Sequence, residues 1–423
     1  MAADLFPAEI ERLERAGRLL LEAEDRLPVL RTIAWERRHA DAFFAAGERE
    51  LPRPDYPRID PEPSLERVAE ARRLIDGDSP VHAWLLRLTE TMADTARLLA
   101  ATGTAGFHTY SRRLYGDPAS PIADGRRTAL DLARRLDDVL ADFEGAAVRL
   151  EPPEQLSARD LKARLDAELP AVFAGQAPRV EVTLDVSAKA AAGRDYIKLR
   201  ADAVFSDLDV TQLLHHEAYI HIATSRNGLQ QARFPILAES HPGNARTQEG
   251  LAVFAEFISG ALDPRRFRRL ADRVIAIDMA ANGADFLELY RFFRERNAPD
   301  RPIEAFESAR RVVRGGLVGG GAPFTKDSVY LGGLLEVHNY LRTAVRAGDP
   351  GLIRLLFAGK MDLADLGAMK QLREAGLISE PAIMPPWARD LRYLLSYLAY
   401  STFLNEIDLA HVAARYEHLF ADD

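Results

Sequence analysis

Cysteine is absent from the 423-residue chain. Its absence excludes disulfide bonds and thiolate ligands, so any bound metal must be held by histidine, aspartate or glutamate side chains. A chain without disulfides is compatible with a reducing compartment, and we expect a cytoplasmic protein.

Long apolar runs and an excess of positive charge are also missing. No stretch of about 18 apolar residues occurs, which excludes a membrane-spanning helix. The start of the chain, Met1 to Leu5, lacks the basic and then apolar segments of a signal peptide. The net charge of −9 argues against a nucleic-acid partner, because such a partner requires a basic surface. We therefore expect a globular protein with no membrane and no nucleic-acid partner.

Lysine is scarce, since only six of the 55 basic residues are lysines. Most of the arginines are expected to be surface residues without a specific role, so a single arginine carries little information. A lysine beside a candidate site carries more.

The length allows two or three domains, and we expect two regions. Residues 1–150 are predicted to form an N-terminal helical region and residues 151–423 a catalytic domain. Five prolines between Leu51 and Pro63 exclude a helix there and predict an extended connector. The helices predicted in the first region cover residues 8–45, 64–76, 80–101 and 123–145.

In the second region, alternating apolar residues predict two strands, at 180–186 and 196–200. We expect a small antiparallel sheet that precedes the helix with the candidate site. An exposed edge of this sheet could pair with an extended substrate backbone, or the strands could form an ordinary hairpin. The fold class is mainly α (α+β), with further helices predicted at 157–173, 247–262, 264–296, 302–313 and 328–347.

The segment from His215 to His221 carries the candidate chemistry. Its sequence, His-His-Glu-Ala-Tyr-Ile-His, holds three of the ten histidines of the chain. Ser206 and Asp209 precede it with the spacing of a capping box, which predicts that a helix begins there. Histidine and glutamate side chains on one helix are what a zinc-dependent hydrolase uses.

The spacing of the histidines predicts a distorted helix. In the usual metallopeptidase pattern the two histidines are four residues apart and face one metal. His216 and His221 are five apart, which leaves their side chains about 140° apart on a regular helix. One π-type turn near residues 218–220 would bring them into line. The alternative pair, Glu217 with His221, has the regular spacing but would use the expected base as a ligand.

A third ligand is expected from the helix that follows. Glu249 and Glu256 lie seven residues apart, on one helix face but about 10 Å from each other, so only one can bind the metal. The other could orient a histidine from the second layer. His215 is expected to be a neighbour of the site rather than a ligand.

Two motifs together resemble a known family. The His-Glu-x-x-x-His segment and the downstream Gln248 to Ala252, Gln-Glu-Gly-Leu-Ala, are similar to the QEGLA-motif family, labelled flavohaemoglobin-expression-modulating in bacteria. Its eukaryotic relatives are the microtubule-associated tyrosine carboxypeptidases, and the resemblance covers about residues 155 to 350. It implies a gluzincin-like zinc metallopeptidase core with His216, His221 and Glu249 as zinc ligands. It also implies Glu217 as catalytic acid/base.

The expected reaction is hydrolysis of a peptide at its C-terminus. Zinc-activated water would attack, with Glu217 as general base. Tyr330 is the first candidate for the donor that stabilises the oxyanion, and His241 is the second. Lys326 and Arg314 flank a glycine-rich stretch at 315–321 and could bind the substrate's terminal carboxylate, and Lys326 is the first choice because lysine is scarce in this chain.

Two other functional classes remain open at this stage. The chain could be a regulatory or scaffold protein that keeps its zinc for structure. It could also be an aminopeptidase-like or endo-acting hydrolase, and an acidic cluster near the metal, in place of Lys326, would favour that activity.

Overall fold

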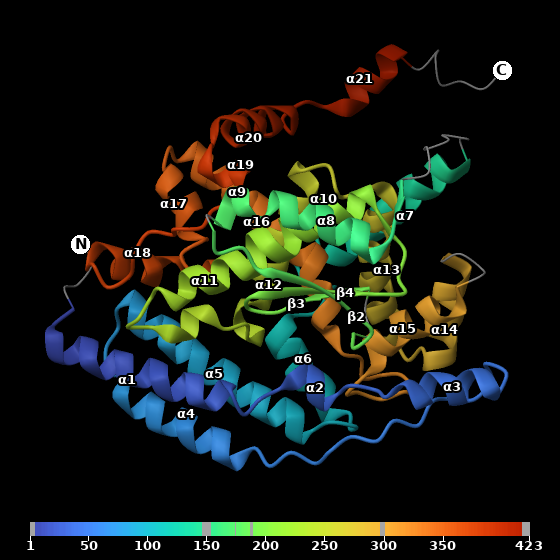
Figure 1. Cartoon of the computed structure of the whole chain (residues 1–423), viewed down its shortest axis with the longest axis horizontal. Coiled ribbons are helices and arrows are strands. Elements are labelled where there is room, and N and C mark those ends of the chain that lie inside the picture. Colours follow the sequence, from blue (N-terminus) through green and yellow to red (C-terminus); the bar gives the residue numbers. More distant parts are fainter. Residues whose placement is uncertain (1–4, 146–153, 174, 187–188, 297–300, 417–423) are drawn as a thin grey trace.

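The computed structural model describes residues 5–145, 154–173, 175–186, 189–296 and 301–416. It is mainly helical with two small sheets, which agrees with the expected fold class. Figure 1 shows the N-terminal helices along one side of the molecule and the C-terminal helices α20 and α21 along the opposite side. No described helix is long and apolar enough to cross a membrane.

The helices of the first third follow the prolines and glycines of the sequence. The predicted helix 8–45 is three helices, because Pro28 and a short extended stretch before Arg37 interrupt it. Residues 51–61 are extended, as the prolines predict. One helix, α6, was not predicted. The elements of this part are α1 (Pro7–Glu24), α2 (Val29–Thr32), α3 (Arg37–Ala45), α4 (Glu62–Leu74), α5 (Pro80–Ala100), α6 (Gly106–Tyr115) and α7 (Ala129–Gly145).

Among the helices predicted after residue 150, those at 302–313 and 328–347 agree with the structure to within one residue, those at 157–173 and 264–296 are each two helices, and the one at 247–262 begins five residues earlier. The described helices of this part also include some outside the predicted ranges. The described helices after residue 150 are α8 (Ala158–Glu168), α9 (Pro170–Phe173), α10 (Asp207–Gln212), η1 (Leu213–Ile222), α11 (Ala223–Leu229), η2 (Pro235–Ala238), α12 (Pro242–Ile258), α13 (Pro264–Ala281), α14 (Phe286–Arg296), α15 (Pro302–Val313), η3 (Thr325–Asp327), α16 (Ser328–Arg346), α17 (Pro350–Leu355), η4 (Leu363–Asp365), α18 (Leu366–Glu374), α19 (Pro386–Arg389), α20 (Arg392–Leu404) and α21 (Leu409–Tyr416).

The N-terminal helices share a core with the second half of the chain. One cluster of buried apolar side chains runs from Leu13 on α1 to Leu398 on α20. Trp84 on α5 packs edge-on against Phe234, with ring centroids 5.6 Å apart. Burial of this common core holds the N-terminal helices against α12 and α16. The division into two domains at residue 150 remains a prediction.

The predicted antiparallel pairing of the two strands is wrong. Strand β2 (Arg179–Thr183) runs parallel to β4 (Tyr196–Arg200), and β3 (Ala190–Ala192) pairs antiparallel with β4, which gives the order β2-β4-β3. The intervening β3 forms the hairpin with β4, so β2 must cross over to the other side of β4. Two further short strands, β1 (Gln155–Leu156) and β5 (Phe205–Ser206), pair antiparallel.

The three-stranded sheet lies against the helix that carries the histidines. Strand β3 is an edge of the sheet and contacts η1. A second core cluster joins Ile197 and Leu199 of β4 to Leu213, Tyr219 and Ile222 of η1. The sheet therefore supports η1 from one side while α12 packs on it from another.

Helices α12 and α16 cross at very short range. A Cβ atom added to Gly250 would lie 2.2 Å from the carbonyl carbon of Gly333, and one added to Gly333 would lie 2.2 Å from the Arg246 carbonyl oxygen. Only glycine allows the two backbones to approach in this way. The crossing fixes the position of α12 relative to the N-terminal end of α16.

Candidate metal centre

The histidine segment adopts the distorted helix that its spacing predicts. The capping box is present: Ser206 Oγ accepts a hydrogen bond from the Asp209 amide at 3.3 Å, and Asp209 Oδ2 accepts from the Ser206 amide at 2.7 Å. The chain then winds as a π-helix from Leu213 to Ile222. Its wider turn brings residues five apart onto one side. The rings of His216 and His221 lie with their centroids 4.9 Å apart.

Glu249 of α12 completes a group of three possible ligands. Its Oε2 lies 3.6 Å from His216 Nε2 and 3.5 Å from His221 Nε2. One ligand atom from each residue lies within 4.8 Å of the others. Two imidazole nitrogens and one carboxylate oxygen so arranged could hold a metal ion and leave a fourth position open.

Glu256 lies behind the group and contacts one of its histidines. Its carboxylate is fully buried and accepts a hydrogen bond from His216 Nδ1 at 2.6 Å. Arg266 of α13 donates to both Glu256 oxygens, at 2.9 and 3.0 Å. Although burial opposes it, contact with His216 and Arg266 lowers the pKa of Glu256 to about 2. This carboxylate fixes His216 with its Nε2 toward the other two residues, as outer-shell partners of metal ligands do.

Glu217 and His215 take different positions beside the group. Glu217 lies partly exposed, with Oε1 3.9 Å from His216 Nε2. His215 points elsewhere, packing edge-on against Tyr219 at 5.2 Å between ring centroids. Burial lowers the pKa of His215 to about 4, so it is neutral at physiological pH.

Four cations and one carboxylate lie on one side of the three possible ligands. We call this set the Lys326 side, and it consists of Lys326, Arg273, Arg311, Arg314 and Asp327. Lys326 Nζ donates to Glu249 Oε1 at 3.1 Å, which leaves Oε2 directed at the histidines. Arg311 binds Asp327 through two hydrogen bonds, at 2.6 and 2.8 Å, and Arg273 lies 3.8 Å from the same carboxylate. The ring of Tyr330 lies next to Lys326 and Arg273, 5.2 and 5.5 Å from their charged groups.

Of the four cations on the Lys326 side, Arg314 is the one whose charge is least balanced by a carboxylate partner. It is buried, and its Nε has no hydrogen-bond partner among the described residues. Burial and the neighbouring Arg311 lower the pKa of Arg314 to about 10, and the same two causes lower the pKa of Arg273 to about 10. Among the described residues, the four cations of this side are thus balanced by two carboxylates, those of Asp327 and Glu249.

A second group, which we call the Lys360 side, comprises Lys360, His241, Glu239, Arg194 and Glu24. Lys360 donates to Ser240 Oγ at 2.7 Å, and burial lowers its pKa to about 8. Burial and then Lys360 lower the pKa of His241, the N-cap residue of α12, to about 4. Glu239 pairs with Arg194. Burial, Glu239 and Asp25 raise the pKa of Glu24 to about 7.

Comparison with known proteins places the chain in a family. The family model for microtubule-associated tyrosine carboxypeptidases matches residues 41–406. The chain belongs to this family. The match includes the three possible ligands and every residue of the Lys326 and Lys360 sides except Glu24. Among curated proteins no significant match is found.

In this family member, the Gln-Glu-Gly-Leu-Ala segment has a physical use for each of its first three residues. Gln248 accepts a hydrogen bond from Thr224 Oγ1 at 2.9 Å, which ties α12 to α11. Glu249 joins the histidines, and Gly250 permits the close crossing with α16. Leu251 and Ala252 are fully buried in the core.

The structure brings together most of the residues singled out in the sequence. His216, His221 and Glu249 converge, with Glu217 and Glu256 around them, and Lys326 contacts Glu249. The sequence reasoning missed Arg266, Arg273 and Lys360. The two arginines were hidden among many others, whereas Lys360, as one of six lysines, offered a usable signal.

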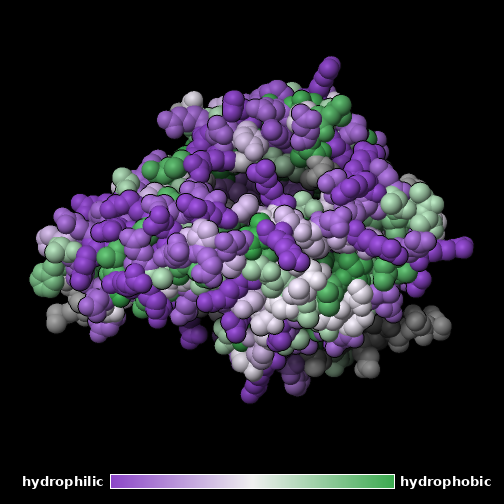
Figure 2. All heavy atoms as spheres, turned by 90° about the horizontal axis from the view of Figure 1, so that it is seen from below, coloured by the Kyte–Doolittle hydropathy of each residue, from purple (hydrophilic) through white to green (hydrophobic). Residues whose placement is uncertain are grey.

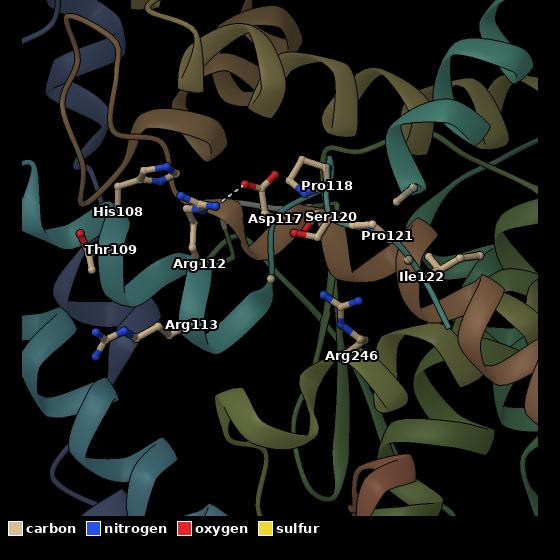
Figure 3. A pocket seen from close by; sticks show the side chains of 14 residues that line it. His108, Thr109, Arg112, Arg113, Asp117, Pro118, Ser120, Pro121, Ile122 and Arg246 are labelled. Carbon is tan, nitrogen blue, oxygen red and sulfur yellow. Dashed lines mark ion pairs between the residues drawn. The ribbon is translucent and has the colours of Figure 1, made fainter. Parts of the chain in front are cut away.

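One described pocket is separate from this group. It has a volume of about 420 Å³ and opens between α6, the loop after it, α12 and α16. Figure 3 shows its arginines, of which Arg112 pairs with Asp117 at 2.9 Å. Arg246 pairs with Glu336 at 2.7 Å. None of the three possible ligands lines it.

Proposed function

We propose that the protein is a zinc-dependent carboxypeptidase. The observation that carries this proposal is the convergence of His216 and His221, from a π-helix, with Glu249 of α12. Two histidines and one glutamate are the ligand set of several zinc peptidases and suit zinc in its catalytic form. The family name supports the carboxypeptidase activity. The gluzincin-like core and the cytoplasmic location are part of the same proposal.

Glu217 is the proposed general base. When bound, zinc would lower the pKa of a coordinated water and polarise the scissile carbonyl. Glu217 follows His216 directly and is partly exposed, so its carboxylate can reach a water at the open position. It would accept the proton of that water and then donate it to the leaving amine. Tyr330 would donate its phenolic hydrogen to the oxyanion, because its ring lies against Arg273 and against Lys326, which contacts Glu249. His241, the second candidate, is assigned to the Lys360 side.

The substrate carboxylate is proposed to bind on the Lys326 side. Burying four cations around two carboxylates leaves an excess of positive charge, and such a cluster is stabilised by an added anion. Arg314 is the first choice for this contact, because its Nε is not already used. Lys326 is engaged with Glu249, so we assign it chiefly to holding that ligand.

The edge of the sheet offers a place for the rest of the peptide. Strand β3 lies at the edge of the order β2-β4-β3 and contacts η1. An extended peptide could pair with this edge while its C-terminus reaches the Lys326 side. The preferred C-terminal residue depends on the contacts of its side chain, and cleavage of a peptide library would identify it.

Replacing Glu217 by Gln tests the mechanism. We expect retained metal, measured by elemental analysis, and a fall in peptide hydrolysis of about 10³- to 10⁴-fold. Exposed Glu90→Gln on α5 is the matched control and should keep full activity. Full turnover by metal-loaded Glu217→Gln would exclude Glu217 as the base.

The same assay separates the alternatives. If zinc-loaded wild-type protein cleaves no peptide of a library, the zinc serves a regulatory or scaffold role. If peptides are trimmed from the N-terminus or cut internally, the protein is an aminopeptidase-like or endo-acting hydrolase. The excess of cations beside Glu249 favours recognition of a carboxylate over recognition of an amine.

A further inference from the structure

The C-terminal helices α20 and α21 expose an unusual amount of apolar surface. Half of the large hydrophobic side chains that are exposed in the described chain lie between residues 393 and 412. Figure 1 shows α20 and α21 along the outside of the molecule, with α21 projecting beyond the main body. We call this segment, residues 392–416, the apolar arm. Its exposed members are Tyr393, Leu395, Tyr400, Phe403, Leu404, Ile407, Leu409 and Val412.

Helix α20 is apolar on both its faces. Leu394 and Leu398 are buried on the inner face, where Tyr397 contacts His338 of α16 at 3.3 Å. On the outer side, Tyr400 and Phe403 are each more than 60% exposed. No charged residue occurs between 393 and 405. A helix that is apolar all round is ordinarily buried, so the outer face of α20 requires a covering partner.

Another surface of the molecule shows what an uncovered face looks like. Figure 2 shows the side built largely from the N-terminal helices, which is mainly hydrophilic with scattered apolar patches. Helix α4, on that side, carries Glu and Arg at most of its exposed positions. The apolar arm departs from this pattern.

We propose that the apolar arm is the interface of a two-fold symmetric dimer, in which the α20 helices of two copies pack against each other. Five exposed apolar side chains of α20 and three that follow it, Ile407, Leu409 and Val412, are 37–72% exposed. If the dimer covered all eight, each copy would contribute roughly 800 Å², the contribution of one partner to an interface of standard size. A symmetric contact uses the same patch on both copies, and because residues 393–405 carry no charged side chain, two copies can meet there without repulsion. Each copy carries a net charge of −9, so a contact through more charged surface would be opposed.

A membrane surface fits the arm less well. Helices that lie on membranes carry Lys and Arg along their polar side. In α20 the only cation is Arg392, which is paired with Asp390, and Glu406 and Asp408 follow the helix. These acidic residues would be repelled by an anionic bilayer.

Sedimentation equilibrium of the full chain at roughly 1–100 µM tests the proposal, since dimerisation depends on concentration. We expect a dimer for the wild type, and a dissociation constant at least about 100-fold higher for Phe403→Glu, because a charge would be buried in the contact. Phe6→Glu, which alters a similarly exposed phenylalanine at the N-cap of α1, is the matched control and should leave the dimer unchanged. A monomeric wild type, or a dimer indifferent to Phe403→Glu, would overturn the proposal.

The absence of cysteine provides a second test that does not depend on the charge substitution. A single Tyr400→Cys substitution can form a disulfide only between two copies of the chain. We expect rapid covalent dimer formation on oxidation, whereas Phe6→Cys should stay monomeric on a non-reducing gel. Cross-linking of Phe6→Cys but not of Tyr400→Cys would place any dimer contact elsewhere. Flotation of a monomeric protein with vesicles of phosphatidylcholine and phosphatidylserine would assign the arm to membranes and overturn the dimer.

Discussion

Lys326 contacts Glu249 directly, and Lys360 interacts electrostatically with Glu249 and Glu217, but the two sides treat charge in opposite ways. On the Lys326 side, burial opposes the charges, yet Tyr330 and Glu249 raise the pKa of Lys326 above its ordinary value, and Arg311 holds the pKa of Asp327 below its ordinary value. On the Lys360 side, burial lowers the pKa of Lys360 to about 8 and raises that of Glu24 to about 7. The groups of the Lys326 side therefore stay charged near neutral pH, whereas Lys360 and Glu24 on the Lys360 side are shifted toward their neutral forms.

The difference suggests how a peptide would be oriented. A buried network that keeps an excess of positive charge binds an anion such as a terminal carboxylate. A network whose groups approach neutrality suits the uncharged part of a peptide chain. Changes to the two sides should therefore have effects of opposite sign, and the following predictions are ordered from the largest expected effect to the smallest.

Asp327→Asn should destabilise the fold by about 3–5 kcal/mol, because Arg311 and Arg273 would lose their buried counter-charge. The free energy of unfolding in urea measures the loss. Glu304→Gln, which removes the partner of Arg301 in an exposed ion pair, is the control, with an expected change below about 1 kcal/mol. A loss for Asp327→Asn no larger than that of the control would show that the two sides do not differ in this way.

Arg314→Gln should raise KM for peptides with a free C-terminus by about 10- to 100-fold, through the loss of a charge-assisted hydrogen bond. Peptides with an amidated C-terminus should be unaffected, so the preference for a free carboxylate would shrink. Arg310→Gln, one helical turn earlier and paired with Glu307, should keep the preference. An unchanged preference in Arg314→Gln, measured as the ratio of kcat/KM values, would place the carboxylate elsewhere.

Lys360→Met should stabilise the fold by about 2 kcal/mol at neutral pH. The pKa of Lys360 is about 8 in the folded state against an ordinary 10.5, so the folded protein carries this charge at a cost below pH 8. Wild-type stability should rise between pH 8 and 10.5, where the unfolded chain binds the proton and the folded chain does not. The variant should lack this rise in urea unfolding, whereas exposed Lys370→Met should retain it. If wild-type stability did not change between pH 8 and 10.5, the predicted difference between the pKa shifts of Lys360 and Lys326 would be wrong.

Glu24→Gln should have the smallest effect. The pKa of Glu24 is about 7 in the folded state against an ordinary 4.5, so the unfolded chain releases this proton first as pH rises. Wild-type stability should therefore fall between pH 4.5 and 7, by about 1 kcal/mol once solvent screening of a half-buried group is allowed for. Glu24→Gln should lack this fall, and exposed Glu11→Gln should show it. Identical thermal unfolding profiles for the wild type and Glu24→Gln would contradict the shift.

The sequence predicted the local features of the site well. The spacing of His216 and His221 demanded a π-type turn, and the chain has one. Ser206 and Asp209 form the predicted capping box. Both features depend on neighbouring residues, which is why they can be inferred from a single sequence.

Pairings over longer distances were harder to predict. The antiparallel pairing of the two strands was wrong, because Ala190 to Ala192 carries no β-branched or aromatic residue and was not expected to be a strand. Arg266 and Arg273 come from α13, a helix whose place beside the site is set by tertiary packing. The predicted ligand roles and the division at residue 150 remain predictions.

The crossing of α12 and α16 at Gly250 and Gly333 has a consequence for engineering. Since the backbones touch there, the separation of the α12 backbone at Glu249 from the start of α16 is set by direct backbone contact, with no side chain between the two helices at the crossing. A methyl group introduced at either glycine would collide with the backbone of the other helix. It would push α12, which carries Glu249, away from α16, which carries Tyr330. Alanine and serine at these positions would therefore form a graded series that alters the geometry of the centre without changing any residue that faces it.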